Sequence, residues 1–257
     1  MRTELWAAAA ALLLAVAAAS SALALAGRDR PWRWLSVAAR GAGIAALAAS
    51  LYLAATGRSG WSPLDLQQVA LSLGLAMVLL HLVLSRVAGS AAGNPLADVL
   101  AGVLAVAAWL AIRPGGESLG CLERALPYRA EWALFLLGSA GALIAGASAL
   151  ALALPWPWAR TGAWDLVAAG CFVATLATGT GILAGLWWSW QSTGSLETGD
   201  LGQSWMAVVW LLAAMSTAAW QLEKRAYQWA AGLALAAAGA ALLGLLALPG
   251  IQSLMGT

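Results

Sequence analysis

Long apolar runs, separated by short clusters of charged and turn-forming residues, are the feature that most constrains this chain. A membrane-spanning helix needs about 20 apolar residues, and about eight runs approach that length. In hydrocarbon every backbone polar group must be bonded within the protein, so such runs form helices and not open strands. We therefore predict an all-α, polytopic membrane bundle, with residues 1–257 as a single domain. The predicted spans are 5–27, 35–57, 65–85, 96–113, 130–154, 164–186, 204–222 and 227–249.

Composition excludes several classes of soluble protein. Of the 257 residues, 62% are hydrophobic and 9% are charged, whereas soluble domains are about 25% charged. The 13 basic and 11 acidic residues leave a formal net charge of +2, so we expect no nucleic-acid partner. No stretch is polar and long enough for a large aqueous catalytic domain, and the sequence nominates no catalytic residue.

The first run resembles a signal peptide, because Arg2 precedes it and Ala24-Leu25-Ala26 resembles a cleavage site. It is longer than a usual signal core, so we interpret it as the first span.

The distribution of Lys and Arg between loops predicts the orientation, because cytoplasmic loops carry more of both. With the N-terminus outside, eight basic residues fall on the cytoplasmic side and five on the outer side. We therefore predict that both termini and the loop at 187–203 are extracytoplasmic, in a bacterial inner membrane. The cytoplasmic set is Arg28, Arg30, Arg33, Arg40, Arg86, Arg160, Lys224 and Arg225, and the outer set is Arg2, Arg58, Arg113, Arg124 and Arg129.

Ionisable residues are nearly absent from the interiors of the predicted spans. Arg40 lies about one and a half turns inside a span, where its long side chain can extend to the cytoplasmic surface. This pattern argues against a proton-coupled transporter and against a channel with charged rings. The acidic residues at predicted span ends are Asp65, Asp98, Glu131, Asp165 and Glu223.

His81 is the single histidine, and it lies about four residues before the cytoplasmic end of its span. Two interpretations stay open: an imidazole that is hydrogen-bonded near the interface, or an axial ligand of haem iron. Cys121 falls in a predicted loop and Cys171 in a span, so we expect no disulfide between them. Without a C-x-x-C pair, we expect no metal site made by this chain alone.

Tryptophan is unusually frequent, with 16 residues. Most lie at predicted interfaces, as in an aromatic belt: Trp32, Trp34, Trp61, Trp156, Trp158, Trp164 and Trp220. A second group brackets the loop at 187–203 and forms either part of the belt or an apolar shelf for a flat ring ligand. This candidate shelf comprises Trp187, Trp188, Trp190 and Trp205, with Trp210 nearby.

In the loop at 187–203, Asp200 is a helix N-cap, a plain acidic loop residue, or a group that orients the loop. The spacing Gly181-x-x-x-Gly185 predicts close helix packing.

Residues 178–210 resemble the cytochrome c assembly family of haem-handling membrane proteins, which have a tryptophan-rich "WWD" loop. The match begins with Gly181-Ile182-Leu183, Gly185 and Trp188, which resemble the family's G-I-L-x-G-x-x-W. Without a gap, Asp200 then falls on the aspartate of the family's motif, Gln203 on its glutamate, and Trp205 and Trp210 on its following tryptophans. Gly60-Trp61-Ser62-Pro63-Leu64 and His81 resemble a second family stretch.

The resemblance implies haem handling in cytochrome c maturation at the outer face, with haem as cofactor and a cytochrome or other membrane subunits as partners, besides lipid. The family's loop tryptophans fall on Thr193, Glu197 and Gly199, and its two outer histidines fall on Leu136 and the region of Ile251-Gln252-Ser253. A further membrane histidine of the family falls on Ala218. With one histidine, the chain has no bis-His haem site of its own.

Two other functions stay open. The chain is either an accessory, non-catalytic subunit of a larger respiratory or photosynthetic complex, or a transporter. The transporter interpretation is the weaker of the two, because the spans carry little charge and show no paired interruptions.

Overall fold

The computed structural model describes residues 2–25, 30–56, 66–87, 95–110, 126–155, 160, 162–194, 201–222 and 226–255. Within these ranges the chain forms eight α-helices of 16 residues or more and no strand, so the predicted all-α membrane bundle is confirmed. The helices are α1 (Arg2–Leu25), α2 (Arg30–Thr56), α3 (Leu66–Val87), α4 (Pro95–Leu110), α5 (Leu126–Ala153), α7 (Ala163–Thr193), α8 (Leu201–Leu222) and α9 (Tyr227–Met255).

Seven of the helices in the described ranges are long and apolar enough to cross a membrane. The exception is α4, whose 16 residues extend over about 24 Å, less than the roughly 30 Å of a bilayer core. By the same measure, the 31 residues of α7 extend over about 46 Å. The predicted span at 164–186 is therefore too short at its C-terminal end, and α7 continues through Trp187, Trp188 and Trp190 to Thr193.

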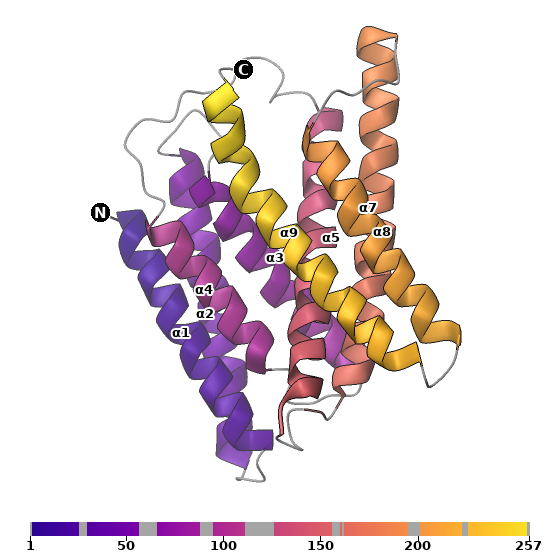
Figure 1. The fold of residues 1–257 in the computed structure, drawn as a ribbon. Helices are drawn as coiled ribbons and strands as arrows, with labels where there is room; N and C mark the ends of the chain where they lie inside the picture. Colours follow the sequence, from indigo (N-terminus) through magenta and orange to yellow (C-terminus); the bar gives the residue numbers. More distant parts are fainter. Residues whose placement is uncertain are drawn as a thin grey trace.

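Consecutive helices run in opposite directions, as Figure 1 shows. The start of α1, the C-terminal end of α7 and the end of α9 all lie toward one end of the bundle, at the top of the view, here called the terminus end. The prediction that both termini share a side with the segment after α7 agrees with this arrangement. Which side faces the cytoplasm stays a prediction.

The bundle consists of two four-helix units. In the N-terminal unit, α1 packs against α2 and α4, and α3 packs against α2 and α4. In the C-terminal unit, α5 packs against α7 and α9, and α8 packs against the same two helices. The units meet mainly along α3 and α5.

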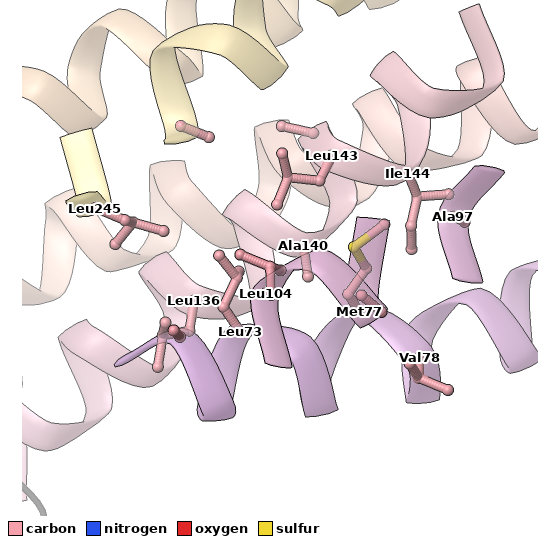
Figure 2. Close-up of a cluster of buried hydrophobic side chains, with 14 of the residues drawn as sticks. Leu73, Met77, Val78, Ala97, Leu104, Leu136, Ala140, Leu143, Ile144 and Leu245 are labelled. Carbon is pink, nitrogen blue, oxygen red and sulfur yellow. The ribbon is translucent and has the colours of Figure 1, made fainter. Parts of the chain in front are cut away.

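A continuous apolar core joins the two units (Figure 2). Leu73 and Met77 of α3 lie near Leu104 of α4, and both groups face α5 residues such as Leu143. Leu245 of α9 closes the same cluster. Lipid tails are as apolar as these side chains, so the helices associate through close van der Waals packing and not through a hydrophobic driving force.

Glycines of α5 and α7 bring these two helices into backbone contact. A Cβ on Gly141 would lie 2.8 Å from the carbonyl oxygen of Gly170, and a Cβ on Gly170 would lie 2.7 Å from that of Gly141. Gly181 and Gly185 are buried on the same helix, α7, and Gly181 lies against Phe135 of α5. The close packing predicted from the spacing of Gly181 and Gly185 is confirmed.

Candidate functional site

A buried ion pair crosses the N-terminal unit. Arg40 of α2 donates two hydrogen bonds to Asp98 of α4, from Nε to Oδ1 at 3.0 Å and from Nη2 to Oδ2 at 2.6 Å. Arg40 is 4% exposed and Asp98 is fully buried. Two-pronged pairing of this kind satisfies both charges in a low-dielectric interior, where a lone charge is very costly.

Hydroxyl groups extend the pair to a third helix. Ser36 lies one turn before Arg40, on the same face of α2. Its Oγ lies 2.5 Å from the Oγ of Ser21 on α1, which also accepts a hydrogen bond of 3.3 Å from Nη2 of Arg40. Both serines are buried.

His81 adds the fourth helix of the unit. Its Nδ1 lies 3.4 Å from Oδ1 of Asp98, and the residue is 1% exposed. The imidazole and the carboxylate are both buried, so the ring lies directly against Asp98 in the interior of the N-terminal unit. We call Ser21, Ser36, Arg40, His81 and Asp98 the charge network.

The charge network corrects one expectation from the sequence. Arg40 does not extend to the surface; this prediction was wrong, because Asp98 lies within reach inside the bundle. Asp98 and Glu131 lie near the starts of α4 and α5, as predicted for residues at span ends, and both are buried between helices.

Sequence reasoning missed the network as a unit, although a signal was present. Arg40 and Asp98 have opposite charge, and both lie near the same predicted end of their spans. Ionisable groups within a membrane usually pair with one another, so this coincidence of depth was the available clue.

A second buried polar contact lies toward the terminus end of the C-terminal unit. Gln203 of α8 donates a hydrogen bond of 2.6 Å from Nε2 to Oε1 of Glu131 on α5. The two residues are 9% and 3% exposed. Gly185 of α7 lies directly against both side chains.

The structure separates the residues of the predicted aromatic shelf. Trp187 and Trp190, one turn apart near the end of α7, are 56% and 57% exposed. Trp188 is partly buried. Trp205 faces α9, where its Nε1 donates a 2.6 Å hydrogen bond to the carbonyl of Ala240 and its ring covers Gly244. The shelf on the described surface is therefore the exposed pair Trp187 and Trp190, and Asp200 lies outside the described residues.

The opposite end of the C-terminal unit carries an aromatic cluster. Trp220 and Tyr227 stack with ring centroids 4.5 Å apart, and Trp164 lies 5.7 Å and 5.2 Å from them. Along α7, Trp164 and Trp187 are separated by about 35 Å, close to the distance between the two interfaces of a bilayer. This separation is the one expected of two aromatic belts, one at each interface.

Haem was the cofactor implied by the resemblance, and two places are relevant to it. At His81 the packing does not fit a porphyrin, because the imidazole and Asp98 are enclosed by the helices of the N-terminal unit. Ligation by His81 stays a prediction that would require these helices to separate. The exposed indoles of Trp187 and Trp190 fit a flat apolar ring but cannot ligate iron. Across the described residues, no group of three or more metal-ligating side chains is found.

Cys171 is a buried free thiol within α7. Its Sγ lies 3.3 Å from Oγ of Ser216, which in turn donates to the carbonyl of Ala230 at 2.8 Å. These bonds connect α7, α8 and α9. The expectation about a disulfide involves Cys121, which lies outside the described residues.

No family model, curated protein or solved structure matches this chain.

Proposed function

We propose that this integral membrane protein presents an apolar ring ligand of the haem class, or helps a partner to present it, on the surface formed by the end of α7. The role corresponds to the haem-handling step of cytochrome c assembly. In this proposal, Trp187 and Trp190 pack against the ring, and a partner supplies the ligands of the iron.

The exposure of Trp187 and Trp190 is the observation that carries the proposal. Both indoles are more than half exposed, near the end of a helix that extends well above its neighbours in Figure 1. The two indoles lie one turn apart on the same helix, so the aromatic end of α7 offers two neighbouring rings to a flat ligand.

Titration of haem into the purified protein in detergent tests the proposal, with the Soret band as readout. We expect binding by the natural protein, and we expect the Trp187→Ala/Trp190→Ala variant to bind about tenfold more weakly or worse, because each aromatic contact contributes about 0.5–1.5 kcal/mol. Trp229→Ala is the matched control, because Trp229 is 75% exposed at the other end of the bundle. Equal affinities in all three proteins would contradict the proposal.

A second candidate function is that of an accessory, non-catalytic subunit of a larger membrane complex. Arg40, Asp98 and His81 face one another within the bundle, which fits a structural role for these groups better than a catalytic one. Purification in a mild detergent, followed by cross-linking and mass spectrometry, tests this role. Recovery of a stable partner supports it, and recovery only as an isolated monomer contradicts it.

A further inference from the structure

We propose that Glu131 and Gln203 form a clamp that fixes the points where α7 and α8 leave the bundle, and thereby positions the aromatic end of α7. These are positioning residues, since neither belongs to the exposed aromatic pair. The inference deepens the proposed function and rests on it for its role, although the clamp itself is tested separately below.

The clamp joins three helices at one level. Glu131 comes from α5 and Gln203 from α8, and their 2.6 Å hydrogen bond crosses beside α7. Gly185 of α7 lies at the crossing, where a Cβ would overlap with Oε1 of Glu131 and Nε2 of Gln203. Only a residue without a side chain lets α7 pass this close to the pair.

Burial makes the clamp specific. A carboxylate that is 3% exposed needs donors within the protein, because water does not reach it. A bond from an amide N–H to a carboxylate is shorter and stronger than a bond between neutral groups. Glu131 therefore holds Gln203, and with it the first turn of α8, at a defined position.

The clamp lies close in sequence to the exposed tryptophans of α7 and to the start of α8. Gly185 lies two residues before Trp187, and Gln203 is the third residue of α8. Just beyond Gln203, Trp205 is bonded to the backbone of α9. Both ends of the connection between α7 and α8 are thus anchored, and the exposed indoles of Trp187 and Trp190 project from a fixed base.

Spin labels test the clamp without any ligand. With Cys121 and Cys171 replaced by Ser, labels on Thr193→Cys and Ser204→Cys, both exposed positions, report the distance between the end of α7 and the start of α8. With Glu131, Gln203 and Gly185 unchanged, we expect a narrow distribution of the distance between the two labels. In Glu131→Ala, Gln203→Ala and Gly185→Ala we expect this distribution to broaden. Glu131→Gln keeps an acceptor oxygen and should restore the narrow peak.

A label pair at the opposite end, on Leu222→Cys and Trp229→Cys, is the matched control. Its distribution should not change in any clamp variant, whereas general loosening of the fold would broaden both pairs. An unchanged peak between α7 and α8 in Glu131→Ala and Gln203→Ala would overturn the clamp, as would equal broadening at both ends. Glu131→Gln and Gly185→Ala keep the test decisive if a larger truncation fails to fold.

Haem titration of the same variants separates the clamp from the proposed function. Weaker binding in Glu131→Ala with recovery in Glu131→Gln supports both. A broadened distance in a protein that binds no haem at all, even with its natural clamp, would retain the clamp and refute the haem-handling role.

Discussion

The two four-helix units of this bundle hold their helices together by different means. The N-terminal unit is crossed by full charges, with Arg40 and Asp98 paired inside it. The C-terminal unit relies on glycine contacts between α5 and α7, and on hydrogen bonds such as those from Gln203 to Glu131 and from Trp205 to the backbone of α9. Lipid gives helices no hydrophobic reason to associate, and the comparison shows that one chain can solve this problem electrostatically and sterically.

Removal of one partner of the buried ion pair should cause the largest loss of stability among these variants. Asp98→Ala or Arg40→Ala leaves one buried charge without its partner, and we expect a loss of about 3–5 kcal/mol in the free energy of unfolding. Thermal and chemical unfolding in detergent measures it. The double variant Arg40→Met/Asp98→Leu should recover most of the loss, because it removes both charges together. If either single variant unfolds like the natural protein, the N-terminal unit does not depend on its charges.

Substitution of the glycines in contact between α5 and α7 should cause the second-largest loss of stability. Gly141→Ala or Gly170→Ala places a methyl group less than 3 Å from a backbone carbonyl of the facing helix, and we expect a cost of about 1–3 kcal/mol. The same unfolding measurement applies. Gly232→Ala is the control, because nothing lies within 4 Å of its position and alanine favours helix by up to about 1 kcal/mol. Equal stability of Gly141→Ala and Gly232→Ala would show that α5 and α7 are not in close backbone contact.

Loss of the hydrogen bond donated by Trp205 should lower the stability least. Trp205→Phe keeps an aromatic ring over Gly244 but loses the donor to Ala240, and side-chain hydrogen bonds within membranes contribute about 0.6 kcal/mol on average. A small fall in unfolding temperature is therefore expected. Trp229→Phe, at an exposed position, should cause none. A loss as large as that of Asp98→Ala would erase the distinction between the units.

Hydropathy predicted most of the fold, because a helix that crosses lipid must be apolar along its length. It misplaced the end of α7, since apolarity stops at the membrane surface while the helix continues. That helix ends at Gly194, which adopts a positive φ of 72° and donates to the carbonyl of Trp190. The residues between the predicted end at 186 and this glycine are compatible with a helix, so the fall in hydropathy there did not mark the end of the helix.

The candidate site was less predictable, because its contacts join residues far apart in the chain. Arg40 and Asp98 are separated by 58 positions, and Glu131 and Gln203 by 72. Composition shows that such residues exist but not which helix faces which. By contrast, the close packing at Gly181 and Gly185 follows from a local spacing and was predictable.

The length of α7 links this protein to the thickness of its surroundings. A helix of about 46 Å fits within a hydrocarbon core of about 30 Å only if it is strongly tilted. Thicker bilayers, built from longer acyl chains, would draw Trp187 and Trp190 down among the headgroups, and thinner ones would raise them into water. We therefore expect access to the indoles to depend on lipid chain length as well as on the amino-acid sequence.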